Sequence, residues 1–104
     1  MKYIRTKDGI YQITDPNRKT NITVCTNHGW VFKEDIIKQA DSIEELCDEF
    51  VYIRHDKPHY PPKVVKDLGA LRENRWCDVF GAIWTGKGLI YVAKLNDEGE
   101  LELL

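Results

Sequence analysis

The sequence contains none of the long apolar runs that cross a membrane. Its apolar stretches are only a few residues long, far short of the roughly 20 residues that a transmembrane helix needs. The N-terminal residues Met1–Arg5 also lack the apolar core of a signal peptide. The three cysteines contain no Cys-x-x-Cys pair and match no disulfide framework. We therefore expect a cytosolic protein with reduced thiols and no membrane partner.

The sequence also lacks a catalytic constellation. The glycine-rich segment Thr85–Gly88 has neither the length of a Walker loop nor a helical pattern after it, so it predicts a hairpin turn. Cys47 falls on the apolar side of a predicted helix, and Cys77 leads into a predicted strand. Neither thiol has a local partner that would activate it as a nucleophile. We expect a protein that is not an enzyme and needs no cofactor.

Four residues come nearest to the spacing of metal ligands. Two residues separate Cys25 from His28, and three separate His55 from His59; zinc accepts both ligand types. Pro58 argues against the helix that would bring the last two histidines to one face. We predict no metal, with a core cysteine and three surface histidines as the simpler interpretation. Zinc binding at these residues stays open as the alternative.

The charge of the chain is small overall but unevenly distributed. The formal net charge is −2, which gives no overall field toward nucleic acid or an acidic membrane. Residues 34–50 carry seven acidic residues and one basic residue, whereas residues 1–33 and 51–76 carry net charges of +4 and +3. The acidic block predicts either a solvated face or a docking surface for a basic partner.

The N-terminal third has the pattern of β-strands. Lys2–Thr6 and Ile10–Thr14 alternate in character around an Asp-Gly dipeptide, which favours a tight hairpin turn. A third strand is expected over Asn21–Thr26. Residues 33–40 fit either a helix turn or the end of a strand.

The C-terminal segment predicts a β-meander. Strands are expected over Trp76–Thr85, Leu89–Asn96 and Glu100–Leu104, with glycine-containing turns between them. A further strand is expected over Val51–His55, and the proline-containing segment Asp56–Pro62 predicts a loop. These strands carry packing residues rather than chemical groups, so they define the class of fold and no site.

The clearest helical pattern covers residues 42–50. Ser42 and Glu45 have the spacing of a capping box. The apolar residues at helical spacing that would form one stripe are Ile43, Leu46, Cys47 and Phe50. The opposite face would be acidic and consists of Glu44, Glu45, Asp48 and Glu49. A second short helix is expected over Lys63–Asn74.

Together these patterns predict the α+β class. An antiparallel β-sheet, made of the N-terminal hairpin and the C-terminal meander, would be covered by one or two short helices. A chain of 104 residues can bury one modest core. We therefore expect residues 1–104 to form a single domain.

Several stretches carry a resemblance to a known group of proteins. They are Met1–Gly9, Ala40–Val51, Gly81–Thr85, Gly88–Lys94 and Leu101–Leu104. In overall pattern they resemble a group of small uncharacterised proteins encoded by phages and prophages of Gram-positive bacteria. The resemblance implies a phage or prophage origin and the cytoplasm of a bacterial host. It implies no activity, cofactor or catalytic residue.

The leading functional prediction is a non-enzymatic accessory protein that binds a bacterial host protein, such as a defence or replication protein. Its predicted binding surface is the acidic face Glu44, Glu45, Asp48 and Glu49, because such a face can dock on a basic groove. The terminal strand Glu100–Leu104 could also pair across a two-fold axis to give a homodimer.

The alternative is a small nucleic-acid or nucleotide-binding protein that uses the basic segments. These segments hold Lys2, Tyr3, Arg5 and Lys7, or Lys63, Lys66, Arg72 and Arg75. The acidic blocks between them argue against nucleic acid as a partner.

Overall fold

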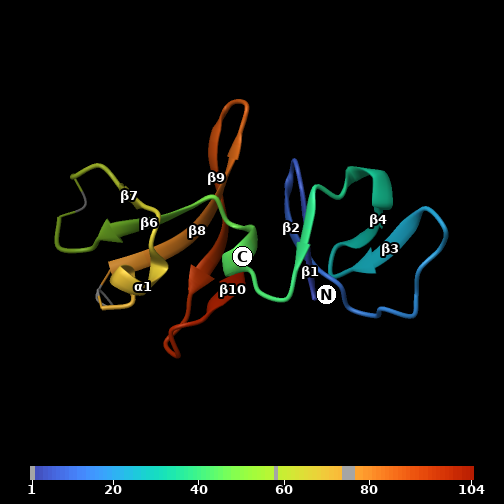
Figure 1. Cartoon of the computed structure of the whole chain (residues 1–104). Coiled ribbons are helices and arrows are strands. Elements are labelled where there is room, and N and C mark those ends of the chain that lie inside the picture. The colour runs from blue at the N-terminus through green and yellow to red at the C-terminus, as the bar shows by residue number, and fades with distance from the viewer. Residues whose placement is uncertain (1, 58, 74–76) are drawn as a thin grey trace. The chain divides into compact units, whose positions relative to one another are not determined.

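The computed structural model describes residues 2–57, 59–73 and 77–104 (Figure 1). Contacts divide the chain into two compact units, Met1–Leu46 and Cys47–Leu104, which we call the N-terminal unit and the C-terminal unit. The single-domain organisation of residues 1–104 stays a prediction. Several residues used in the sequence predictions lie outside the described part, namely Met1, Pro58, Asn74, Arg75 and Trp76.

The N-terminal unit contains a three-stranded antiparallel sheet in the order β2-β1-β5. β1 (Tyr3–Thr6) and β2 (Gly9–Gln12) form a hairpin in which Thr6 lies opposite Gly9, so the predicted N-terminal hairpin is confirmed. β5 (Lys38–Ala40) pairs with the other edge of β1. The central strand therefore places Ile4 in the core, where its side chain is 1% exposed.

A second hairpin completes the N-terminal unit. β3 (Thr23–Thr26) confirms the predicted third strand and pairs with β4 (Gly29–Phe32). Gly29 closes the turn with φ of 101°, in the left-handed region that favours glycine. The 3₁₀ turn η1 (Lys33–Asp35) follows β4. The ambiguous residues 33–40 thus contain a 3₁₀ turn and then a strand.

The C-terminal unit contains a five-stranded antiparallel sheet in the order β10-β9-β8-β6-β7. Its strands are β6 (Glu49–Arg54), β7 (Lys63–Val65), β8 (Cys77–Thr85), β9 (Gly88–Leu95) and β10 (Leu101–Leu103). The last three confirm the predicted meander, and the long β8–β9 hairpin is visible in Figure 1. Phe50, Leu68 and Val79 form a buried cluster on this sheet.

The α+β fold class predicted from the sequence is wrong. The described residues form an all-β fold of ten antiparallel strands in three sheets. Their helical segments are η1, a second 3₁₀ turn η2 (Glu44–Leu46) and the four-residue α1 (Leu68–Leu71). No helix among the described residues has the length and apolar character needed to cross a membrane.

The helix predicted over residues 42–50 is wrong because the sheet competes for its second half. Glu44–Leu46 forms only a 3₁₀ turn, and β6 begins at Glu49. The β6 residues Phe50–Ile53 are aromatic or β-branched, types that favour strands. β6 pairs with both β7 and β8, so strand pairing prevails over the local capping box.

The helix predicted over Lys63–Asn74 is also wrong over its first turn. Lys63–Val65 forms β7, where Val64 lies opposite Val51 of β6. The short α1 follows, capped by the Asp67 carboxylate, which accepts a hydrogen bond from the Gly69 N–H at 2.8 Å. Within residues 63–73, which the structure describes, the helical pattern therefore forms a single turn.

Candidate functional site

The four predicted binding acids do not share a helical face. Glu44 and Glu45 are exposed on η2 at the end of the N-terminal unit. Asp48 and Glu49 lie near the start of the C-terminal unit, and Glu49 is half-buried at the start of β6. The predicted helical arrangement is therefore wrong, while a role for these residues in partner binding stays a prediction.

The candidate metal ligands are divided between the two units. Cys25 lies on β3 and His28 in the β3–β4 turn, where its ring meets Tyr11 edge-on at 5.9 Å between centroids. His55 and His59 belong to the C-terminal unit. Among residues 2–57, 59–73 and 77–104, no group of three or more histidine, cysteine or acidic side chains could hold a metal ion.

One polar cluster in the C-terminal unit resembles part of a catalytic site. His55 Nε2 lies 3.2 Å from Asp78 Oδ1, and Lys94 Nζ lies 3.4 Å from the same oxygen. Cys77 lines the same hollow, but burial raises the pKa of its thiol, which disfavours the nucleophilic thiolate. The cluster can hold an ion pair, and it offers no activated nucleophile.

In the first predicted basic segment, Arg5 takes part in a structural hydrogen bond. The Arg5 side chain is half-buried, and its Nη1 donates to the Leu46 carbonyl at 3.2 Å. In the second segment, Lys63 lies on β7 opposite Tyr52. Arg72 of the same segment donates through Nε to the Gly99 carbonyl at 3.1 Å, so each segment has an arginine that makes a structural hydrogen bond.

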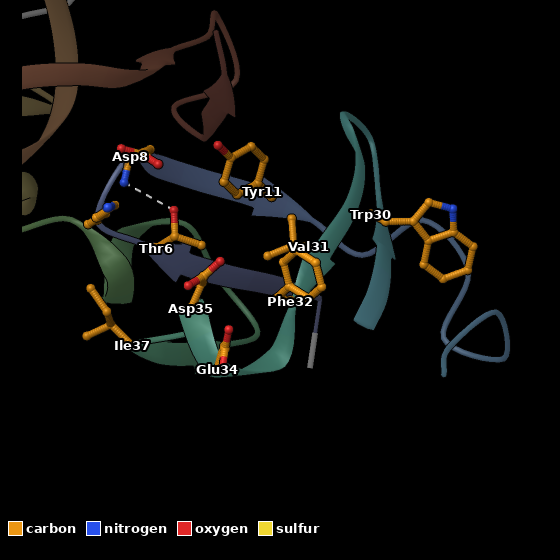
Figure 2. A pocket seen from close by; sticks show the side chains of 10 residues that line it. Thr6, Asp8, Tyr11, Trp30, Val31, Phe32, Glu34, Asp35 and Ile37 are labelled. Carbon is orange, nitrogen blue, oxygen red and sulfur yellow. Dashed lines mark hydrogen bonds between the residues drawn. The ribbon is translucent and has the colours of Figure 1, made fainter. Parts of the chain in front are cut away.

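The N-terminal unit has a groove that the sequence analysis missed (Figure 2). It occupies about 430 Å³ between the β1–β2 hairpin and the segment from β4 to Ile37. Its apolar lining includes Tyr11, Val31, Phe32 and Ile37, and its acidic lining is Asp8, Glu34 and Asp35. We call this hollow the β4 groove.

Large apolar side chains of this region face solvent. Phe32 is 50% exposed and Ile37 is 63% exposed, and the neighbouring Trp30 is also exposed. Single exposed apolar residues are ordinary, but a contiguous group beside a hollow is typical of an interaction surface. The exposure marks the β4 groove as the candidate binding surface of this unit.

The groove follows an unpaired strand edge. Trp30, Val31 and Phe32 all line it, although alternate residues of a strand point to opposite faces. Lining by consecutive residues is expected where a hollow runs along the edge of a strand. In the described part of the chain, β3 is the only strand that pairs with β4, so the other edge of β4 remains open.

The hydrogen-bond alternation identifies which backbone groups lie on that edge. The Lys33 N–H donates to the Ile22 carbonyl at 2.7 Å, so this pair is hydrogen-bonded. Bonded and non-bonded pairs alternate in an antiparallel ladder. The backbone N–H and C=O groups of Trp30 and Phe32 therefore point away from β3, toward the open edge.

The charge of the groove is negative. Three carboxylates line it, against the single ammonium of Lys7. Figure 2 shows Asp35 and Glu34 on the same side as Phe32, with Tyr11 across from them. The Asp8 N–H donates to Thr6 Oγ1 at 3.1 Å, which fixes the turn that carries the Asp8 carboxylate. The arrangement favours a cationic ligand with apolar side chains.

The sequence held one usable signal for this groove. The apolar run Trp30-Val31-Phe32 is followed directly by Lys33 and then by the acidic pair Glu34-Asp35. An apolar strand next to an acidic turn is unusual for a strand that packs entirely in a core. The contribution of Asp8 and Tyr11 depends on folding, because they are distant in sequence.

Comparison of the chain with known protein families, with curated proteins and with solved structures found no match.

Proposed function

We propose that this chain is a non-enzymatic accessory protein, of phage or prophage origin, that binds a protein of its bacterial host in the host cytoplasm. The proposed docking surface is the β4 groove, and the proposed occupant is an extended, basic segment of the partner. The observation that carries the proposal is the coincidence of exposed apolar side chains, three carboxylates and an open strand edge.

The open edge of β4 provides the mode of binding. An extended peptide can add to such an edge as a further strand, with main-chain hydrogen bonds supplying affinity. The outward-facing groups of Trp30 and Phe32 are the proposed partners of its backbone. Alternate side chains of the peptide would then meet the apolar lining, which gives the interaction its sequence preference.

The apolar lining provides part of the binding free energy. Full burial of a phenylalanine or isoleucine side chain is worth about 1.5–3 kcal/mol. Phe32 and Ile37 are roughly half to two-thirds exposed, so each has about 1 kcal/mol still to gain when a partner covers it. These two side chains are the proposed apolar anchors.

The carboxylates determine the charge of the occupant. Asp8, Glu34 and Asp35 are exposed to solvent, where a charged partner is attracted mainly in the encounter step. Lysine or arginine in the partner segment is therefore expected to speed association, and added salt to slow it.

A random peptide display library tests the proposal. Selection on the full chain is expected to enrich peptides that alternate apolar and basic residues. These peptides should lose binding to the triple variant Asp8→Lys, Glu34→Lys and Asp35→Lys. The matched control Asp97→Lys, Glu98→Lys and Glu100→Lys has the same change in charge at exposed positions of the C-terminal unit and should keep binding.

Two outcomes would contradict the proposal. One is enrichment of peptides without basic residues, and the other is unchanged binding in the triple variant. A further variant, Glu44→Lys with Glu45→Lys, examines the surface predicted from sequence. If this double variant lost binding while the triple groove variant kept it, the docking surface would lie at η2 instead of the β4 groove. Circular dichroism of each variant checks that it remains folded.

A further inference from the structure

We propose that the C-terminal unit carries a separate binding site for a nucleotide, recognised through its base and its phosphate. The site is a hollow of about 370 Å³ lined by Tyr52, Arg54, Tyr60, Pro61, Pro62 and Lys63. Its volume lies within the range of ordinary small-ligand pockets. The nucleotide could be free or part of a single strand, since both present the same base and phosphate chemistry.

The aromatic part of the site consists of one anchored ring and one exposed ring. Tyr52 is half-buried and packs against the cluster that contains Phe50 and Val79. Tyr60 is 52% exposed, and the His59 ring meets it edge-on at 4.6 Å between centroids. Because every base has a flat π-face, an exposed tyrosine can stack on a base with little dependence on sequence.

The prolines help to hold the exposed ring in place. Pro61 and Pro62 follow Tyr60 directly and precede β7. Proline fixes φ, and it also restricts the residue before it to extended conformations. The backbone at Tyr60 is therefore restricted before a ligand arrives, which lowers the entropy lost on binding.

The cationic part of the site lies beside these rings. Lys57 Nζ is 5.3 Å from the centroid of Tyr60, and Lys63 Nζ is 5.9 Å from the centroid of Tyr52. Within the described residues, no carboxylate lies within ion-pair distance of either ammonium. Each ammonium is therefore available to a phosphate while it remains close to an aromatic ring.

Arg54 contributes to the site in a different way. Its Nε and Nη2 donate to the two carboxylate oxygens of Asp56, at 3.3 and 3.1 Å. This bidentate pair holds the guanidinium at the edge of the hollow and offsets its charge. We therefore assign phosphate binding to Lys57 and Lys63, whereas Arg54 forms part of the wall of the hollow.

The combination distinguishes a nucleotide from simpler anions. The lysines alone would be enough to bind an inorganic anion, and the tyrosines alone would be enough to bind a neutral aromatic compound. The two features lie side by side in this one hollow, which is the pattern found where single-stranded nucleic acid stacks along a basic surface. The site belongs to the C-terminal unit and is independent of the β4 groove.

Fluorescence anisotropy of a labelled oligothymidylate with the full chain tests this site, together with calorimetric titration by AMP and by UMP. Tyr60→Ala is expected to weaken binding about tenfold or more, whereas Tyr60→Phe should retain it. Lys57→Ala with Lys63→Ala should reduce the slope of log affinity against log salt by about 1 to 2. The matched controls Lys87→Ala and Trp84→Ala remove an exposed lysine and an exposed tryptophan elsewhere in the same unit and should bind normally.

The outcomes separate the two sources of the nucleotide. Binding of the oligonucleotide but not of AMP or UMP assigns the site to a single strand, and comparable affinity for all three assigns it to free nucleotides. The proposal is overturned if none of the three binds, or if the Tyr60 and lysine variants bind as tightly as the parent chain. Binding of an acidic peptide in place of all three probes would also overturn it.

Discussion

The backbone N–H of Trp84 donates a hydrogen bond to the carboxylate of Asp48, with 2.8 Å between nitrogen and oxygen. The backbone N–H of Asp48 donates in turn to the Ala82 carbonyl at 2.9 Å. The residue before β6 is therefore tied to β8 at two points. Asp48, which was predicted from the sequence to lie on a docking face, therefore has a structural role in the sheet.

Replacement of Asp48 tests that structural role. Asp48→Ala leaves the Trp84 N–H without its acceptor and is expected to lower the free energy of unfolding by about 1–2 kcal/mol. Asp48→Asn keeps a side-chain oxygen and should cost less. Urea denaturation of both variants measures the difference. The exposed Glu45→Ala is the control, expected within about 0.5 kcal/mol of the parent chain; equal stability of Asp48→Ala and the parent would contradict the assignment.

The segment around Asp48 shows what the sequence could predict here. Ile43, Leu46 and Phe50 were expected on one apolar stripe, and all three are buried. Their burial arises differently, because Leu46 lies in the 3₁₀ turn η2, Ile43 directly precedes that turn, and Phe50 lies in a strand. Local spacing thus identified core residues, whereas the choice between helix and strand depended on pairing with β7 and β8.

Gly81 provides a second test, at the bulge of β8. A Cβ on Gly81 would lie 2.6 Å from the Cys47 sulfur, closer than van der Waals contact allows. Gly81→Ala is therefore expected to destabilise the fold by about 1–3 kcal/mol through overpacking. In a double-mutant cycle, Cys47→Ala should remove much of that penalty by clearing the space. Additive effects of the two substitutions would contradict the close approach.

Cys77 gives the protein a dependence on pH above neutrality. Burial raises the pKa of its thiol in the folded state. The folded state therefore holds this proton more tightly than the unfolded state, whose thiol has a pKa of about 8.5. The resulting stability is fully present below that value, and it is lost as the pH rises through the higher folded pKa.

Two measurements examine this behaviour. Urea denaturation from neutral to alkaline pH should show a fall in stability that is smaller in Cys77→Ala. Iodoacetamide should label Cys77 in the native protein more slowly than the partly exposed Cys25. Labelling of Cys77 as fast as that of Cys25 would show that the thiol is accessible and would contradict the assignment.

The exposed apolar anchors should contribute little to folding. Phe32→Ser removes a half-exposed side chain and is expected to cost under about 1 kcal/mol of stability. Ile4→Ala empties a site in the core, where such a truncation costs about 2–5 kcal/mol. Thermal or urea unfolding of the two variants makes the comparison. Equal losses would mean that Phe32 is a core residue rather than part of a docking surface.

The β4 groove was beyond prediction from sequence for a physical reason. Its acidic and apolar residues come from the β1–β2 hairpin and from the segment from β4 to Ile37, which folding brings together across intervening strands. Periodicity reports which residues of one element share a face, and it carries no information about such distant pairs. Strand propensity predicted the hairpins and the meander, because those depend on neighbouring residues.

Hydrogen–deuterium exchange with a selected basic peptide tests the central claim most directly, namely that a partner binds along the open edge of β4. The account predicts slower exchange of the Trp30 and Phe32 amides in the complex, with the C-terminal unit unchanged. The same experiment on the triple groove variant should show no protection. Protection centred on η2 and β6, with β4 unaffected, would contradict the account.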